Sequence, residues 1–476
     1  MSEYEVICGL EIHVQQNTKT KMFCRCNNDS ENARPNTNVC PVCMGFPGQL
    51  PKANKKAIEK SIAAGLMFGS QIPERSMFDR KNYFYPDSPK GYQITQNFHP
   101  IAIGGNVEVE IKEGKKNIRI HHMHLEEDAG KLTHTAQGSL IDYNRTGTPL
   151  MELVTEPDIN SVEEAVAFAK EVQRIMRYSG ASNADMEKGM MRFDVNVSLR
   201  PFGQKEFGNK VEIKNLNSFS SMEKAFHYEI KRQTKALKAG ETIHQETRGW
   251  DDVKQKTTSQ RSKETAFDYR YHPEPDLPPV VHKQVLVDKI KATLPELPIV
   301  KRQRYVDYGI GYDESVLLSN TLEMAQFFEE ASSIADDPKK SAAFITTNLL
   351  KHLNENHIDI KDSIVTAKHI GELVNLINNE TISNNTAKNE VMSFMLETGD
   401  MPSEIVEEKG LKQVVDTNLI DTLCKKAIES NQKAVDQYKG GHKKAIGALV
   451  GFCMKEGKGQ VNPKHISEHL EKLLSE

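Results

Sequence analysis

The first part of the chain, to about residue 290, alternates between apolar and polar positions in short segments, a pattern typical of β-strands. The alternation is clearest in segments 10–15 (LEIHVQ), 193–199 (FDVNVSL) and 211–214 (VEIK). Because successive side chains of a strand point to opposite faces, each segment has one apolar and one polar face. We therefore expect half-buried strands in a largely antiparallel sheet.

Helical spacing interrupts the strands twice and then dominates the rest of the chain. Residues 161–179 place apolar side chains at helical spacing, and they begin with Ser161 and Glu164 in the positions of a capping box. A second helix is expected over 221–239. After about residue 296, helical spacing recurs in four clear segments: 314–331, 341–353, 367–378 and 386–397.

A proline-rich join separates the two parts of the chain. Six prolines lie between Pro273 and Pro298, and proline resists both helix interiors and central strands because it lacks a backbone donor. A charged, turn-like stretch at 397–410 is expected to divide the helical part again. The sequence thus predicts an α+β protein with a β-rich domain, 1–294, a helical domain, 295–405, and a small helical tail domain, 406–476.

Composition and charge narrow the classes of protein. A chain of 476 residues is too long for one ordinary hydrophobic core. It has no apolar run near the roughly 20 residues of a membrane-spanning helix and no signal-peptide pattern at its start, so we expect a soluble, cytoplasmic protein. The net charge of −4 excludes a globally basic nucleic-acid binder.

The tail has the opposite charge from the whole chain. Residues 424–476 hold ten lysines and no arginine against six acidic residues, a net charge of +4. Local positive charge in an acidic protein suits a phosphate backbone. A solvated helical face would have the same composition, so charge alone leaves both interpretations open.

Four cysteines form the sharpest local motif. Cys24 and Cys26 are followed, after thirteen residues, by Cys40 and Cys43. Two such knuckles can supply the four soft ligands of tetrahedral zinc, and four cysteines leave no open position for a substrate, so segment 24–43 is expected to hold a structural zinc ion. Unrelated cytosolic thiols are one alternative. A redox pair of Cys40 and Cys43 is another, but it leaves the first two cysteines unexplained.

Acidic and histidine side chains recur on the polar strand faces. Glu11 and His13 are two residues apart and share one face. Glu127 is expected in the turn that leads to Gly130. The same two-residue spacing recurs in three further segments: His122, His124, Glu126 and Asp128; Asp194 and Asn196; Glu212 and Lys214. If these faces converge, they form a carboxylate-lined cradle for Mg²⁺, which prefers oxygen ligands and usually binds with phosphates. Separate solvated faces are the alternative.

Phosphate binding would need basic side chains, because neither a Walker A motif nor Gly-x-Gly-x-x-Gly occurs. Segment 78–87 (FDRKNYFYPD) combines such residues with three consecutive aromatics that include Tyr83. Stacking and cationic contacts suit a nucleotide or an RNA end; an edge strand with inward-packed aromatics is the alternative. The basic candidates along the chain are Arg80, Lys81, Lys90, Lys131, Arg192, Arg200 and Lys214.

Taken together, the motifs resemble the B subunit of the glutamine-dependent aspartyl/glutamyl-tRNA amidotransferases. The resemblance spans essentially the whole chain, and six separated motifs in order are far more specific than one. They are 9–14 (GLEIHV), 78–87, 125–131 (LEEDAGK), 142–149 (DYNRTGTP), 192–201 (RFDVNVSLRP) and 214–219 (KNLNSF), and segment 268–276 (DYRYHPEPD) and the tail from Ala445 also match.

The resemblance implies a β-rich cradle, a helical domain and a small tRNA-binding tail, within a heterotrimer that also contains the amidase (A) subunit together with a small (C) subunit. It implies that the cradle uses ATP and Mg²⁺ to activate the side-chain carboxylate of a misacylated tRNA(Gln) or tRNA(Asn). Ammonia released from glutamine by the amidase then attacks. The present chain has no Gly/Ser-rich amidase signature, so the ammonia is expected from that partner.

The resemblance also implies roles for individual residues. Glu11, His13 and Glu127 are the expected Mg²⁺ ligands, and the weaker candidates are Glu152, Asp194 and Glu212. Lys81, Tyr83 and Lys90 are expected along the route by which ammonia enters the cradle, and these three residues together with Glu11, His13 and Glu127 make up the expected catalytic group. The residues expected near ATP are Arg80, Lys131, Arg192, Asp194, Glu212 and Lys214.

Two other interpretations remain. A zinc-bearing tRNA-binding scaffold without catalysis would have the same tail and cysteines. The archaeal-type relative specific for Glu-tRNA carries an inserted domain, for which the passage from Pro275 to Pro298 leaves no room. Whether Asp-tRNA, Glu-tRNA or both are substrates is not determined by the sequence.

Overall fold

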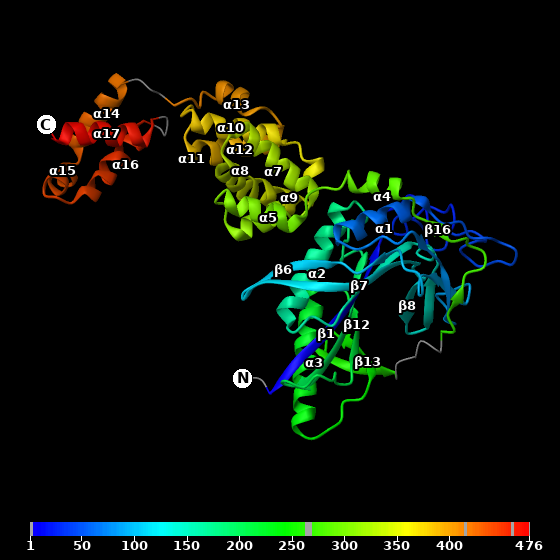
Figure 1. Cartoon of the computed structure of the whole chain (residues 1–476). Helices are drawn as coiled ribbons and strands as arrows, with labels where there is room; N and C mark the ends of the chain where they lie inside the picture. Colours follow the sequence, from blue (N-terminus) through cyan, green and yellow to red (C-terminus); the bar gives the residue numbers. More distant parts are fainter. Residues whose placement is uncertain (1–2, 262–268, 414–416, 458–460, 476) are drawn as a thin grey trace. The chain divides into compact units, whose positions relative to one another are not determined.

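The chain folds into two compact units, residues 1–300 and residues 301–476. The computed structural model (Figure 1) describes residues 3–261, 269–413, 417–457 and 461–475. All strands of this described part lie in the first unit, and the second unit is helical. The predicted α+β class is therefore confirmed. The division falls inside α5 (Pro298–Asp307), shortly after the predicted boundary at 294/295.

A nine-stranded sheet forms the centre of the first unit. Its strands are β1 (Tyr4–Gln15), β5 (Ala102–Ile103), β6 (Asn106–Ile111), β7 (Gly114–Glu127), β10 (Pro149–Thr155), β11 (Met191–Pro201), β12 (Val211–Leu216), β13 (Glu246–Asp251) and β14 (Lys256–Arg261). The order is β14-β13-β12-β11-β1-β10-β7-β5, and β6 also pairs with β7. Only β12 and β13 pair in parallel, so the described sheet is largely antiparallel, as predicted.

Strand β1 lies in the middle of this sheet and has the predicted two faces. Leu10, Ile12 and Val14 are buried, while Glu11 and His13 between them are half-buried. Three long helices pack against the strands of the sheet: α1 (Lys55–Met67), α2 (Val162–Tyr178) and α3 (Phe219–Lys238). The polar face of β1 is thereby left to line the site.

The two predicted helices of the first unit are present. Helix α2 begins after Ser161, whose hydroxyl accepts a 3.1 Å hydrogen bond from the backbone of Glu164, as the capping pattern indicates. Helix α3 begins at Phe219, two residues before the expected start, because Ser218 caps it by accepting from the backbone of Ser221. A further short helix, α4 (Gln284–Lys291), lies before the junction with the second unit.

Three small sheets accompany the main one. The sheet that matters for the site is formed by β3 (Asp79–Asn82), β4 (Tyr92–Thr95) and β15 (His272–Pro273). The others pair β2 (Arg75–Ser76) with β16 (Val280–Val281), and β8 (Lys131–Thr135) with β9 (Gly138–Asp142). Asp268, the first residue of the motif at 268–276, lies outside the described residues.

The described residues of the second unit form two hydrophobic clusters. The first cluster extends from Tyr305 to Val406, and the second from Ile420 to Leu474. Its helices after α5 are α6 (Tyr312–Leu318), α7 (Leu322–Ala335), α8 (Pro338–Phe344), η1 (Ile345–Leu349), α9 (Leu350–Asn356), η2 (Ile360–Asp362), α10 (Ala367–Asn378), α11 (Asn384–Thr386), η3 (Ala387–Val391), α12 (Met392–Thr398), α13 (Pro402–Glu408), α14 (Thr417–Ser430), α15 (Gln432–Lys439), η4 (Lys443–Ala445), α16 (Ile446–Glu456) and α17 (Pro463–Ser475).

The expectation of a turn-like stretch at 397–410 is wrong, because this segment contains helix α13. Ile405 and Val406 of this helix both pack in the first cluster, so the expected boundary at 405/406 falls inside a helix. The division of the chain into three domains stays a prediction. No helix among the described residues has the length and apolar character needed to cross a membrane.

Candidate active site

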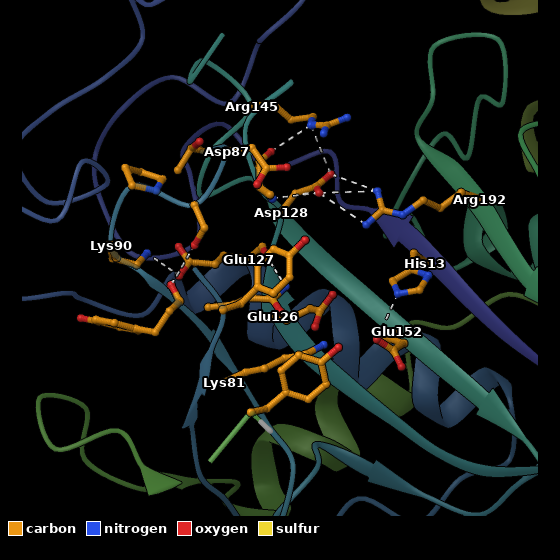
Figure 2. A pocket seen from close by; sticks show the side chains of 18 of the residues that line it. His13, Lys81, Asp87, Lys90, Glu126, Glu127, Asp128, Arg145, Glu152 and Arg192 are labelled. Carbon is orange, nitrogen blue, oxygen red and sulfur yellow. Dashed lines mark hydrogen bonds and ion pairs between the residues drawn. The ribbon is translucent and has the colours of Figure 1, made fainter. Parts of the chain in front are cut away.

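A pocket of about 390 Å³ opens on the polar face of the main sheet. Its walls come from strands β1, β7, β10, β11 and β12 and from the β3–β4 hairpin (Figure 2). The ionisable side chains that line it are His13, Lys81, Tyr83, Asp87, Lys90, Tyr92, Glu126, Glu127, Asp128, Arg145, Glu152, Arg192, Lys214 and Tyr269. Segments far apart in the sequence thus line one strongly charged cavity.

One group on the pocket wall consists of His13, Glu126 and Glu152. Strand pairing places His13 opposite Glu152, and Glu152 opposite His124 of β7. The His13 Nε2 atom lies 3.1 Å from a carboxylate oxygen of Glu152, and the three residues offer ligand atoms within 4.8 Å of one another. One imidazole and two carboxylates at this spacing can hold a divalent cation.

The electrostatics of this group favour the charged carboxylate. Burial raises the pKa of Glu152, but His124, His13 and Lys81 outweigh burial and hold this pKa well below its usual range. Burial lowers the pKa of His13, and the neighbouring Glu152 carboxylate outweighs burial and raises it. The Nδ1 atom of His13 is buried and has no hydrogen-bond partner in the described part of the chain. The nitrogen that faces Glu152 is Nε2, so Nδ1 on the other side of the ring is a separate buried polar atom that remains unsatisfied within the described residues.

A second acidic group lies beside the first on the same sheet. Glu11, Asp194 and Glu212 come from β1, β11 and β12, and their ligand atoms also lie within 4.8 Å of one another. Lys214 places its Nζ atom 3.1 Å from Asp194 and 3.8 Å from Glu212. Burial lowers the pKa of Lys214, but these carboxylates outweigh burial and raise it. The second group therefore contains its own cation.

The structure separates Glu11 from His13, although both lie on one strand face. Residues two apart in a strand are about 6.6 Å apart along it, so each of them meets different partners across the sheet. Glu11 faces Asp194 of β11, and His13 faces Glu152 of β10. The expectation of one ligand set containing both residues is corrected to two neighbouring groups.

Glu127 is not in either group. Strand β7 extends through Glu127, and Glu126 and Glu127 both line the pocket but contact different neighbours. The Glu127 carboxylate forms an ion pair with Lys90 and accepts a 3.0 Å hydrogen bond from the backbone of Ile94. Figure 2 shows the Lys90–Glu127 pair away from the His13–Glu152 pair. The carboxylate that lies with His13 and Glu152 is that of Glu126, and not that of Glu127 as expected.

Four of the expected basic residues, Lys81, Lys90, Arg192 and Lys214, line the pocket. Lys81 points toward the acidic group, and its Nζ atom lies 4.8 Å from the centre of the Tyr269 ring. Burial lowers the pKa of Lys81, but Tyr271 and the carboxylates of the pocket outweigh burial and raise it. Arg192 and Lys214 also contribute to the wall, as does Tyr83, which stacks on Tyr85 with ring centres 5.8 Å apart.

Arg80 and Lys131 do not reach the pocket. Arg80 follows Asp79 and precedes Lys81 on β3, so its side chain points away from the face that carries Lys81. Its guanidinium makes two hydrogen bonds, of 2.7 and 2.9 Å, to Glu274. Lys131 is exposed on β8 and is absent from the pocket wall. The expectation that these two residues contact ATP is therefore not supported by their positions.

Asp128 forms the centre of a charged network at the pocket wall. It accepts a 2.7 Å hydrogen bond from Gln15 and lies 3.4 Å from Arg192 and 3.7 Å from Arg145. Burial raises the pKa of Asp128, but Arg192 and Arg145 outweigh burial and lower it to about 2. The carboxylate thus keeps the arginine side chains in fixed positions at the cavity.

Asp128 is expected to stabilise the fold above about pH 4 and to lose this contribution as the pH falls to about 2. The sign follows because a carboxyl group with a lowered pKa in the folded state stabilises that state above its unfolded pKa, and protonation at the folded pKa removes the effect. This decrease in the pKa of Asp128 corresponds to about 2 kcal/mol of folding free energy. Urea unfolding should show Asp128→Asn less stable than wild type at pH 6, with a gap that narrows at pH 2.5. If the difference in stability between the two proteins is the same at both pH values, the stabilising role of the Asp128 carboxylate is wrong.

Some pocket residues had no individual role in the prediction. Glu126 and Asp128 were expected only as part of the possible carboxylate cradle, from the two-residue spacing that they share with His122 and His124. Arg145 lies in the motif at 142–149 but has no distinctive spacing. Its place beside Asp128 follows from the loop between β9 and β10, which local sequence patterns do not predict.

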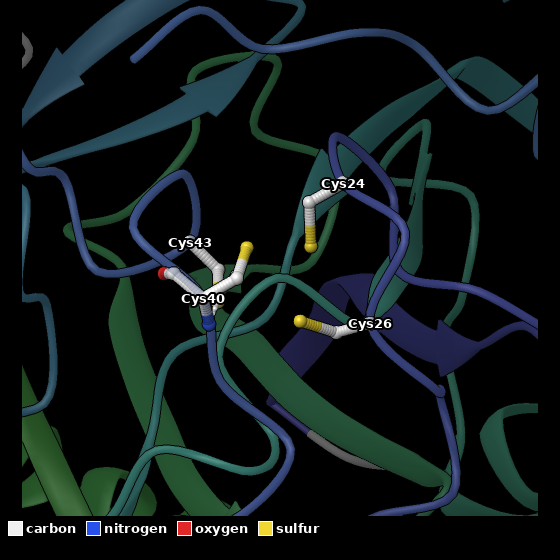
Figure 3. Close-up of side chains that lie close together, drawn as sticks. All are labelled: Cys24, Cys26, Cys40 and Cys43. Atoms are coloured by element: carbon white, nitrogen blue, oxygen red, sulfur yellow. Dashed lines mark hydrogen bonds between the residues drawn. The ribbon is translucent and has the colours of Figure 1, made fainter. Parts of the chain in front are cut away.

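The four predicted cysteines come together. Cys24, Cys26, Cys40 and Cys43 place their sulfur atoms within 4.8 Å of one another (Figure 3). A hydrogen bond from Cys24, together with the nearby ammonium of Lys21, lowers the pKa of Cys43 to about 5. The thiolate is the form that binds metals. The group is therefore able to hold a metal ion.

Comparison with known proteins finds similar sequences over nearly the full length of the chain. Residues 6–288 match the model of the GatB/GatE catalytic domain, and residues 326–474 match that of the GatB domain. The chain is 48% identical to the aspartyl/glutamyl-tRNA(Asn/Gln) amidotransferase B subunit of Thermotoga sp. (strain RQ2), over 99% of both chains. It is 48% identical to the protein of that name from Persephonella marina, over 99% of this chain and 100% of the relative, and 44% identical to that from Brevibacillus brevis, over 100% of both.

The first half of the chain thus carries a GatB/GatE-type catalytic domain, and the second half carries a GatB-type helical region. The chain belongs to the family of aspartyl/glutamyl-tRNA(Asn/Gln) amidotransferase B subunits.

Proposed function

We propose that this protein activates the side-chain carboxylate of Glu-tRNA(Gln), Asp-tRNA(Asn) or both with ATP, so that ammonia can convert it to the amide. The observation that carries the proposal is the buried group of His13, Glu126 and Glu152 on the wall of a charged pocket. The names of the full-length relatives describe amidotransferases that act on these two tRNAs.

The pocket suits phosphoryl transfer. A carboxylate is a poor acyl donor until it becomes an acyl phosphate, and transfer of the γ-phosphate depends mainly on positioning and on nearby positive charge. His13, Glu126 and Glu152 would hold a Mg²⁺ ion, with Glu11, Asp194 and Glu212 as a second acidic group. When bound, Mg²⁺ would neutralise charge on the phosphate oxygens. Among the chain's own cations, Arg192 and Lys214 are placed to orient phosphates at the wall.

The Lys90–Glu127 side of the pocket is proposed as the side that receives ammonia. Lys90, Tyr92 and Glu127 line both the main pocket and a smaller cavity of about 50 Å³ that Cys24 and Cys43 also line. Lys81 and Tyr83 line the main pocket near them. The ammonia would come from an amidase (A) subunit, with a small (C) subunit to complete a heterotrimer in the cytoplasm.

The test is ATP cleavage by the complex reconstituted with its amidase and its small third member. Misacylated tRNA should stimulate Mg²⁺-dependent ATP cleavage, and Gln-tRNA or Asn-tRNA should form when glutamine is added. Both misacylated tRNAs are assayed separately, because the preferred substrate follows from which one turns over. Binding of both tRNAs without stimulated ATP cleavage would contradict the proposal and favour a non-catalytic scaffold.

The tail is proposed to bind tRNA. Residues 424–476 carry a net charge of +4 in a chain of net charge −4, and 420–474 build a hydrophobic cluster of their own. Removal of residues 414–476 should weaken tRNA binding by about tenfold or more at low salt, with a smaller salt dependence, because counterion release is lost. The cut follows Leu411, which packs on the first cluster. Filter binding at several salt concentrations measures this, and unchanged affinity would contradict it.

A structural zinc ion at the four cysteines completes the proposal. The ligand set has four sulfur atoms and no open position, which is typical of structural zinc. The group lies beside the pocket, since Cys24 and Cys43 line the smaller cavity that Lys90 and Glu127 also line.

A further inference from the structure

The turn that carries the last two cysteines is in close contact with Lys90. Gly45 follows Cys43 by two residues and has a φ of +68°. A Cβ atom added at Gly45 would lie 2.6 Å from the Cγ atom of Lys90 and 3.0 Å from its Cα atom. Both atoms belong to the base of the residue, so Lys90 could make room only by moving its backbone or its whole side chain.

The turn itself is held by backbone hydrogen bonds and by the cysteine group. The backbone nitrogen of Met44 donates to the carbonyl of Cys40 at 3.0 Å, and that of Phe46 donates to the carbonyl of Pro41 at 2.9 Å. The backbone nitrogen of Cys40 donates to the sulfur of Cys43 at 3.2 Å. A metal ion on the four sulfur atoms would fix this turn relative to Cys24 and Cys26, since four ligands define its geometry.

The partner of Lys90 also lies beside the cysteine group. A Cβ atom added at Gly147 would meet Lys21, Cys43 and Glu127 at 3.5, 3.7 and 3.8 Å. Gly147 accepts a 2.7 Å hydrogen bond from the backbone of Met22, next to fully buried Lys21. Both members of the Lys90–Glu127 ion pair are therefore packed around the cysteine turn.

We propose that the four-cysteine turn is a positioning element of the reaction pocket, in which Gly45 fixes Lys90 so that its ammonium group stays on Glu127. Lys90 and Glu127 are only 8% and 5% exposed, so the pair has little solvent to replace a lost contact. The consequence for amidation rests on the proposed function, but the contact itself does not. Gly45 is thus a positioning residue, and a metal ion held by the four cysteines would act on the pocket through this turn.

The first experiment measures the accessibility of Lys90 in the full-length, zinc-loaded protein. Gly45→Ala is compared with Gly48→Ala, because Gly48 also has a positive φ, +78°, but an added Cβ there meets nothing within 4 Å. Both variants carry the same backbone strain. Labelling by an amine-selective reagent, read by mass spectrometry, should become about fivefold or more faster at Lys90 in Gly45→Ala only, since a buried ion pair that loses its geometry exposes its ammonium group. Metal content should stay equal in both variants.

A double-mutant cycle keeps the proposal testable if Gly45→Ala is poorly folded. Lys90→Ala removes the Cγ atom that an added Cβ at Gly45 would meet. The loss of thermal stability caused by Gly45→Ala should therefore exceed that caused by Gly48→Ala in wild type. The difference between the two losses should shrink in the Lys90→Ala background, where the closest contact is removed and only the Cα and Cβ atoms of residue 90 remain near the added Cβ. Equal losses in wild type, together with unchanged labelling of Lys90, would overturn the proposal.

The effect on the reaction is measured in the reconstituted complex. Gly45→Ala should lower the amide formed per ATP cleaved by about tenfold or more, because displacements near 1 Å carry such costs, whereas Gly48→Ala should match wild type. If the wild-type complex cleaves no ATP but Lys90 labelling responds as expected, the proposed function fails and the positioning role stands. If amide formation per ATP is unchanged although Lys90 becomes accessible, the positioning role in the reaction fails.

Discussion

Replacement of Glu126 by glutamine is expected to reduce tRNA-stimulated ATP cleavage by about 10²–10³-fold, the cost of removing one group that stabilises charge in the transition state. The reason is its place with His13 and Glu152, within 4.8 Å, where it would complete the ligands of a divalent cation. The measurement is ATP cleavage by the reconstituted complex at saturating misacylated tRNA. The affinity for Mn²⁺ as a Mg²⁺ substitute, measured by titration, should fall in parallel.

The adjacent residue supplies the matched control. Glu127→Gln changes the same side chain by the same atoms on the same strand, but its carboxylate contacts Lys90 and the backbone of Ile94. ATP cleavage in this variant should stay within a few-fold of wild type, while the amide formed per ATP falls. The sequence alone favours the opposite result, loss of ATP cleavage on replacing Glu127. If Glu127→Gln abolishes ATP cleavage and Glu126→Gln does not, the assignment of the two residues made from the structure is wrong.

Replacement of Cys40 by serine is expected to remove the bound metal and to lower the midpoint of thermal unfolding by more than about 5 °C. Metal binding contributes about 10 kcal/mol or more to the folding of small zinc domains. In this chain the four sulfur atoms join segment 24–26 to the turn that packs on Lys90, so part of that contribution stabilises the pocket wall.

Metal content and thermal unfolding of the purified protein check this expectation. Wild type should contain about one zinc per chain, as four cysteine ligands imply, and Cys40→Ser close to none. Cys8→Ala serves as the control, because Cys8 is a fully buried free thiol outside the group; this variant should keep its zinc. A metal-free wild-type protein that unfolds at the same temperature with and without a chelator would refute the structural role.

Cations near the two acidic groups explain why so many acidic side chains are tolerated on one face of the sheet. Glu11, Asp194, Glu212, Glu126 and Glu152 all lie there, and like charges in close contact raise each other's pKa unless cations compensate. The described structure supplies Lys81, Arg192 and Lys214 at the wall. A bound divalent cation would provide the remaining compensation, which is why the strand faces differ from ordinary solvated ones.

Much of the molecule could be predicted from the sequence. The alternation in β1 and β11, the capping residues of α2 and the four cysteines each depend on local spacing, which the chain fixes without reference to distant segments. The ordered motifs then indicate the family, because several exact segments in the same order do not recur by chance. These parts of the prediction agree with the structure: the α+β class, the antiparallel sheet and the grouping of the cysteines.

Tertiary structure decided how the site residues are distributed. Spacing places Glu11 and His13 on one strand face, but the strands on either side of β1 determine that each joins a different acidic group. The pairing of β10 with both β7 and β1 determines that Glu126, and not Glu127, lies in the group with His13 and Glu152. The physical reason is that a side chain's neighbours across a sheet depend on register, and register is set by hydrogen bonding between strands that are distant in the sequence. The sequence by itself determined which chemical groups are present, and only the folded sheet decided which of them act together.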